Sequence, residues 1–183
     1  VLIENSYIEG TVDFIFGNAD AYIKDSRIYM AYFSGRKSGY FTAPNTSKTN
    51  VGFVFDNVHI DVSEQYPSDA TISLGRPWQT EIATETIRTK AGTTVLQSYD
   101  KEQKNPIYLT TGSASTFINS KMSDKIVANR WGVWTRKDAK GNLVDVTYHP
   151  DVRFTEFNSQ AFDGSLLETR TLPLGQMLTG DSS

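Results

Sequence analysis

The sequence contains no cysteine, which excludes disulfide bridges and thiolate chemistry. It has no block of basic residues and a net charge of −3, so nucleic acid is not an expected partner. Its apolar runs are far shorter than the roughly 20 residues that a membrane-spanning helix needs, so no membrane span is expected. What it has is a hydrophobic fraction of 38% in 183 residues, enough for one folded domain with a real core.

Strand-forming residues dominate the chain, in short runs of Val, Ile, Thr, Tyr and Phe broken by Gly, Asn, Asp and Ser. Four segments share one pattern, with an apolar first residue, Asn or Asp in third place and Ile or Met at the end. They are Ile3–Ile8, Ile23–Ile28, Phe55–Ile60 and Phe117–Met122. One local pattern at unequal intervals predicts the stacked coils of a β-solenoid, with loops of different length between them.

The Asn and Asp residues of this repeat are expected at turns, where their side chains bond the backbone and the left-handed conformation is tolerated. Met122 closes a repeat and is expected in the core, whereas His59 and His149 are expected at the surface. A β-sandwich remains an alternative, since short strands also build that fold and Asp163-Gly164 is a hairpin signal. No acidic cluster has the spacing of a metal site, so no metal is predicted.

Asp13 lies inside an apolar run, in the stretch "GTVDFIFGNA". Burying a carboxylate is costly unless the group is paired or hydrogen-bonded. One interpretation is a strand residue that faces solvent. The other is a reactive carboxylate on the floor of a cleft, with Phe14 and Phe16 as aromatic platforms around it. The local pattern alone leaves both open.

The stretch "SLGRPW" is the second candidate for chemistry. Gly75 and Pro77 indicate a rigid bend around Arg76, whose planar fork can hold a carboxylate through two charge-assisted bonds. Trp78 follows directly and could serve as a platform for a sugar face. The alternative is a surface arginine in a turn beside a core tryptophan.

Taken together, "GTVDFIFGNA" and "LGRPW" resemble the signature motifs of pectin methylesterases, which remove methyl groups from homogalacturonan. The resemblance covers 1–78 well and returns around "FINSKMSDKI" and "GVWTRKDAKGN". It implies a right-handed parallel β-helix, an all-β fold, that forms a single domain over 1–183 with a long loop at about 79–104.

The resemblance also implies a role for each candidate residue. Asp13 matches the family's nucleophile, which attacks the ester carbonyl, forms an acyl-enzyme and releases methanol. Arg76 matches the arginine that orients this carboxylate, while Phe16 and Trp78 match aromatic residues that contact the sugar. Trp134 lies where some bacterial members place an apolar contact. No cofactor is implied, and the lack of metal spacing argues against a Ca²⁺-dependent pectate lyase.

The family's general acid and two oxyanion glutamines lie upstream, in motifs reading Gln-Asp-Thr-Leu and Gln-Ala-Val-Ala-Leu, and neither motif occurs here. The chain is therefore expected to be a C-terminal portion of such an enzyme, truncated at its N-terminal side and inactive alone. The family implies methylated homogalacturonan as the partner, a secreted or cell-envelope location and a monomer at full length. Two alternatives stay open: a catalytically incomplete β-helix that binds polysaccharide, and a relative that acts on another ester.

Overall fold

The computed structural model describes residues 1–46, 49–78, 113–135 and 152–169, together with the backbone of 87–88, 95–96, 136–137 and 143–145. Every regular element in these described residues is a strand, as expected for an all-β chain. No helix in the described part is long and apolar enough to cross a membrane. The predictions for His149 and for the loop at about 79–104, apart from its two short backbone strands, concern residues outside the described part.

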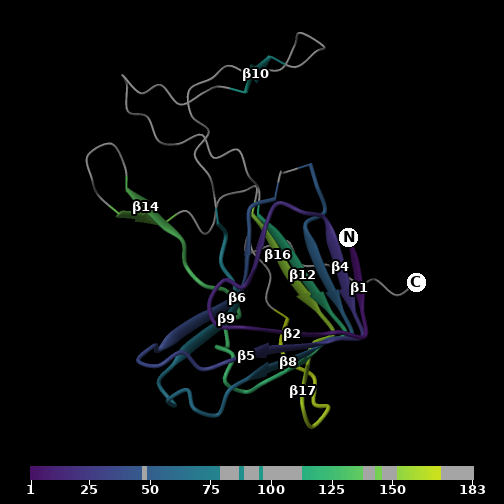
Figure 1. Ribbon diagram of the computed structural model, residues 1–183, viewed down its shortest axis with the longest axis vertical. Coiled ribbons are helices and arrows are strands. Elements are labelled where there is room, and N and C mark those ends of the chain that lie inside the picture. The colour runs from purple at the N-terminus through teal and green to yellow at the C-terminus, as the bar shows by residue number, and fades with distance from the viewer. Residues whose placement is uncertain are drawn as a thin grey trace.

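Three parallel sheets make up the body of the molecule (Figure 1). The first sheet contains β1 (Leu2–Glu4), β4 (Ala21–Lys24), β7 (Phe53–Asp56), β12 (Ala114–Ile118) and β16 (Arg153–Phe157). The second contains β2 (Tyr7–Gly10), β5 (Arg27–Met30), β8 (His59–Val62), β13 (Lys121–Met122) and β17 (Gln160–Ala161). The third contains β3 (Ile15–Gly17), β6 (Ser38–Pro44) and β9 (Thr71–Gly75).

The chain visits these sheets in turn, and each strand pairs in parallel with the equivalent strand of the next coil. This is a parallel β-helix, as predicted, and it excludes the β-sandwich, whose strands would pair mainly antiparallel. Antiparallel pairing between named strands is confined to two small hairpins in the described residues. They are β10 (Ile87–Arg88) with β11 (Val95–Leu96), and β14 (Thr135–Lys137) with β15 (Leu143–Asp145).

The core consists of columns of side chains that the parallel register aligns from coil to coil. On the second sheet one column runs through Ile8, Ile28, Ile60 and Met122. Met122 is 1% exposed, so its predicted core position is confirmed. On the first sheet the rings of Phe55 and Phe117 stack with centroids 4.3 Å apart. Stacked identical or similar residues bury apolar area in every coil, which is the main source of stability in a solenoid.

The corner between the first and second sheets is built from left-handed Asn and Asp residues, as the repeat predicts. Their φ angles are 48° at Asn5, 48° at Asp25, 51° at Asn57 and 52° at Asn119. A fifth member, Asn158 at 53°, was not predicted, because its unit begins with Glu156 instead of an apolar residue and ends in Ala rather than Ile or Met. We call these five residues the Asn/Asp ladder.

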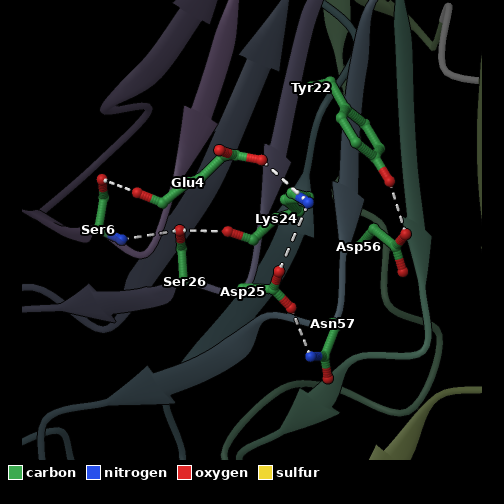
Figure 2. A network of polar contacts seen from close by, with 8 residues as sticks. All are labelled: Glu4, Ser6, Tyr22, Lys24, Asp25, Ser26, Asp56 and Asn57. Atoms are coloured by element: carbon green, nitrogen blue, oxygen red, sulfur yellow. Dashed lines mark hydrogen bonds and ion pairs between the residues drawn. The ribbon is translucent and has the colours of Figure 1, made fainter.

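Side chains of the ladder bond from one coil to the next. The Asn57 amide donates to Asp25 over 2.7 Å, and the Asn158 amide donates to Asn119 over 2.9 Å. The first of these bonds is visible in Figure 2, beside an ion pair of 2.9 Å between Glu4 and Lys24 on adjacent strands of the first sheet. The ladder therefore holds the coils in register at the surface while the apolar columns do so inside.

One inward position carries a charge that the sequence pattern did not reveal. Glu156 is aligned with Phe117 by the strand register and is 0% exposed. Its carboxylate lies 3.4 Å from the buried Arg130 guanidinium and accepts a hydrogen bond of 2.9 Å from Ser159. A buried carboxylate needs such partners, because an uncompensated charge in the core is strongly destabilising.

Candidate active site

Asp13 departs from strand geometry just before β3. Its φ is +52°, in the left-handed region that costs a residue with a side chain about 1–2 kcal/mol. Its backbone N–H donates to the carbonyl oxygen of Tyr40 over 2.7 Å, which ties this conformation to the neighbouring coil. The Asp13 side chain is 25% exposed, so it is neither buried in the core nor a freely solvated strand residue.

Arg76 directly follows β9 and holds Asp13 at two points. Its Nε lies 3.1 Å from Asp13 Oδ1 and its Nη2 lies 2.5 Å from Asp13 Oδ2. The Arg76 N–H donates to the Thr42 carbonyl over 3.1 Å, so the coil that contains β6 also positions this residue. A two-point bond to guanidinium fixes both the position and the plane of the carboxylate.

A cleft of about 290 Å³ opens above this pair, lined by Asp13, Phe16, Ala43, Trp78 and Trp134. Phe16 is 65% exposed, and its ring centroid lies 6.2 Å from that of Trp78. The interpretation that gave Phe14 a place beside Asp13 in the cleft is wrong, since its ring packs against the core residue Phe41 at 5.7 Å and does not line the cleft. The cleft therefore combines aromatic walls with one oriented carboxylate, which suits binding of a sugar ring.

Two aromatic rings face the Arg76 guanidinium. Its central carbon lies 4.2 Å from the Tyr40 ring centroid and 4.9 Å from the Trp134 ring centroid. Trp131, in the same stretch as Trp134, is 4% exposed and packs in the core. Sequence reasoning proposed Trp134 for the cleft, and the structure places it there. The sequence analysis did not identify Tyr40 and Ala43 as residues of this site. They lie in an apolar stretch two coils away from Trp134, and that position was the only indication that the sequence offered.

Close packing between coils at this site requires glycine at two positions. A Cβ at Gly75 would lie 2.1 Å from Thr42 Oγ1, and a Cβ at Gly132 would lie 2.3 Å from Cε1 of Tyr40. Neither distance is possible for a real Cβ, so a side chain there would displace its neighbour. Because these two glycines have no side chain, the coils that carry Arg76 and Tyr40 can pack closely against each other.

The surroundings of the pair limit the chemistry that it can perform. Among the described residues that line the cleft, Asp13 is the only titratable one. Within the same described residues, no group of three or more His, Cys, Asp or Glu side chains converges to hold a metal ion. An oriented carboxylate with an open face toward a cleft can act as a nucleophile or as a base. His59 is exposed on the second sheet and stacks on Phe162, away from the cleft.

The sequence matches the family model for pectinesterase over residues 2–104, which is more than half of the chain. The chain belongs to the pectinesterase family. The match includes both stretches on which the resemblance rests, those around Asp13 and Arg76. The resemblance stated from these two motifs is therefore confirmed.

Relatives of this pectinesterase-family chain include Pectinesterase A of Dickeya chrysanthemi, 29% identical over 166 residues. That alignment covers 87% of this chain and 40% of the relative. Pectinesterase B of Dickeya dadantii is 27% identical over 168 residues, which are 86% of this chain and 34% of the relative. The chain thus spans well under half the length of these curated relatives.

Solved pectin methylesterases share the fold. The enzyme from Yersinia enterocolitica superposes with a TM-score of 0.63 at 28% identity, over 91% of this chain and 46% of that one. A pectin methylesterase in complex with a hexasaccharide gives a TM-score of 0.62 at 27% identity, over 92% of this chain and 45% of that one. These neighbours agree with the parallel β-helix described above.

Proposed function

We propose that this protein hydrolyses the methyl esters of homogalacturonan in pectin and releases methanol. The observation that carries the proposal is the two-point contact between Arg76 and Asp13 on the floor of an aromatic cleft. Membership of the pectinesterase family supports the reaction class. A structural neighbour that was solved with a hexasaccharide supports a polysaccharide substrate.

In the first step, an Asp13 carboxylate oxygen attacks the ester carbonyl carbon of a methylated galacturonate. The bond from that carbon to the methoxy oxygen breaks, methanol leaves after gaining a proton, and a mixed anhydride joins the substrate to Asp13. This covalent route replaces one difficult displacement by two easier ones. Arg76 aims the carboxylate, because its two N–H donors bond both carboxylate oxygens.

In the second step, water attacks the anhydride, frees the galacturonate carboxylate and restores Asp13. The aromatic side chains Phe16, Trp78 and Trp134 supply the walls on which the sugar rings lie. The proposal assigns the nucleophile, its arginine and the aromatic walls to this chain. It assigns the proton donor for methanol and the oxyanion donors to groups other than the described residues lining the cleft.

The size of the substrate bears on where the protein works. A pectin polymer does not cross a lipid membrane unaided, so we place the activity at the cell envelope or outside the cell. The competing proposal is a β-helix that only binds the polymer through its exposed aromatics. A pure binding protein has no need for a carboxylate held at two points by arginine, which favours the enzyme.

The deciding experiment measures methanol released from highly methylated pectin by the protein at its full encoded length. We expect Asp13→Asn to lower the rate by roughly four orders of magnitude, as for loss of a nucleophile. Asn tolerates the left-handed backbone, so the fold should remain intact. Asp25→Asn is the matched control, because it makes the same change at a ladder residue with the same backbone conformation, and it should leave the rate unchanged.

Two results would contradict the proposal. The first is methanol release by Asp13→Asn at the wild-type rate. The second is no release by the wild-type protein while it is still retained on a pectin affinity gel, which would favour the binding function.

A further inference from the structure

Tyr40 contacts both members of the charged pair although it is not among the described residues that line the cleft. Its backbone carbonyl accepts the Asp13 N–H bond of 2.7 Å. Its ring lies 4.2 Å from the guanidinium carbon of Arg76. Tyr40 belongs to β6, and its third-sheet neighbours are β3, which follows Asp13, and β9, which precedes Arg76. One residue therefore connects the coils that carry the two charges.

The Tyr40 ring restricts where the guanidinium can lie. Arginine is attached through a long flexible chain, and a two-point bond to a carboxylate requires one orientation of its plane. Aromatic rings hold a guanidinium by cation–π attraction and by contact area. With Tyr40 at 4.2 Å and Trp134 at 4.9 Å, Arg76 has two aromatic partners in addition to Asp13.

The Tyr40 ring is itself held from a segment two coils away. Gly132 packs against it so closely that a Cβ would come within 2.3 Å of Cε1 and 2.8 Å of Cδ1. The same Cβ would lie 3.5 Å from the Cβ of Arg76, an ordinary contact. A methyl group at Gly132 would therefore overlap the tyrosine ring, whereas its contact with Arg76 would cause no overlap.

We propose that Tyr40 is a positioning residue for the hydrolysis: its ring, backed by Gly132, sets the plane of Arg76 and thereby the aim of Asp13. This inference rests on the function proposed above. It concerns the ring and not the phenolic hydroxyl, because the contact to Arg76 is made by the ring face. It also separates Tyr40 from Phe16 and Trp78, which line the cleft where the sugar would lie.

The test compares Tyr40→Phe, which keeps the ring, with Tyr40→Leu, which removes it. Both variants keep the backbone carbonyl that receives the Asp13 N–H bond. In methanol release we expect Tyr40→Phe to stay within about twofold of wild type, and Tyr40→Leu to lose about tenfold in kcat with KM unchanged. An equal kcat for the two variants would overturn the proposal, as would a loss that appears mainly as a raised KM.

A second variant leaves Tyr40 in place and displaces its ring. Gly132→Ala should lower kcat in the wild-type background, because the new methyl group overlaps the ring. In the Tyr40→Leu background the same change should cost little, since the ring that it displaces is absent. Equal costs in both backgrounds would show that Gly132 acts independently of Tyr40 and would contradict the proposal. If Tyr40→Leu folds poorly, Gly132→Ala carries the test by itself: it should lower kcat with KM unchanged, and an unchanged kcat would overturn the proposal.

A readout without catalysis separates this inference from the proposed function. The Arg76 side-chain Nε–H signal, assigned by its loss in Arg76→Lys, should show a ring-current shift by NMR in the wild type and in Tyr40→Phe. In Tyr40→Leu the signal should move toward the positions of exposed arginines. If the wild type releases no methanol but the signal behaves in this way, the function fails and the positioning by Tyr40 stands. A signal that is the same in all three proteins would overturn the inference even in an active enzyme.

Discussion

Asp13 and Asp25 are the same residue type in nearly the same backbone conformation, with φ of 52° and 48°. Their side chains nevertheless bond partners of different charge. Asp25 accepts a bond from the neutral amide of Asn57 in the next coil. Asp13 accepts two bonds from the cationic Arg76. The comparison shows that a left-handed aspartate in this fold is not in itself a mark of function.

The partners and the repetition distinguish the two sites. The conformation of Asp25 recurs at the same corner at Asn5, Asn57, Asn119 and Asn158, where it turns the chain from the first sheet to the second. Asp13 lies outside this ladder and faces a cleft with aromatic walls. A left-handed residue that recurs in every coil supports the fold, whereas one outside the repeat that has a charged partner and also faces a cleft is a candidate for chemistry.

The strongest way to test this difference compares two arginine–aspartate pairs. Arg76→Lys keeps the charge but loses the planar fork, so methanol release should fall about 10- to 100-fold. Arg27→Lys makes the same change at the Arg27–Asp61 pair on the outer face of the second sheet, where the arginine is 55% exposed. It should leave the rate unchanged and the free energy of unfolding within about 0.5 kcal/mol. Similar losses of activity in both variants would remove the distinction between the two pairs.

A smaller effect is expected when the conformation of the ladder is changed. Asn57→Ala and Asn57→Gly both remove the amide that bonds Asp25, but only glycine adopts φ of +51° without strain. The alanine variant should therefore be about 1–2 kcal/mol less stable than the glycine variant in urea unfolding. Neither change should alter methanol release per folded molecule. Equal stabilities of the two variants would show that the left-handed backbone carries no strain there.

The smallest expected effect is a pH dependence of stability at the edge of the ladder. The Tyr22 hydroxyl donates to Asp56 over 2.6 Å and the Asn119 amide donates over 3.0 Å, and these bonds lower the pKa of Asp56 below 3.8. The Tyr22 bond to Asp56 also raises the pKa of Tyr22 above 10.0. A lowered carboxyl pKa stabilises the fold above the unfolded value, and this contribution is lost as pH falls through the folded value.

Replacement of Tyr22 by Phe should therefore lower Tm most at neutral pH. The difference from wild type should shrink below pH 3.8, where Asp56 gains a proton, and again above pH 10.0, where Tyr22 loses one. Tyr29→Phe removes a hydroxyl from the second sheet and serves as the control. A Tm difference for Tyr22→Phe that stays constant across this range would contradict the assignment.

Much of the fold was predictable because its causes are local and repeated. The repeat predicted the corners and the column through Ile28, Ile60 and Met122. Its pattern is an apolar residue, then Asn or Asp, then a closing Ile or Met. The two motifs likewise predicted that Asp13 and Arg76 would be candidates for one site. The family match then confirmed the resemblance, while the catalytic roles remain proposals.

Residues that act through distant partners were not predictable in this way. Tyr40 and Gly132 are 92 residues apart, and nothing in either local pattern indicates that a ring in one coil fills the space left by a glycine in another. Glu156 was missed for the same reason, since its partner Arg130 comes from a different coil. One of the two interpretations of the Asp13 stretch placed Phe14 in the cleft, whereas its ring packs against Phe41 in the core.

Local sequence is sufficient to specify the stacked coils with Asn/Asp corners, because backbone preference and apolar periodicity act within a few residues. It also contains the two motifs of the family. Which side chains meet depends instead on how the coils pack on one another. The pitch of the coils sets the 4.2 Å contact between Tyr40 and Arg76 and the two bonds to Asp13, and that pitch depends on packing across every layer of the core.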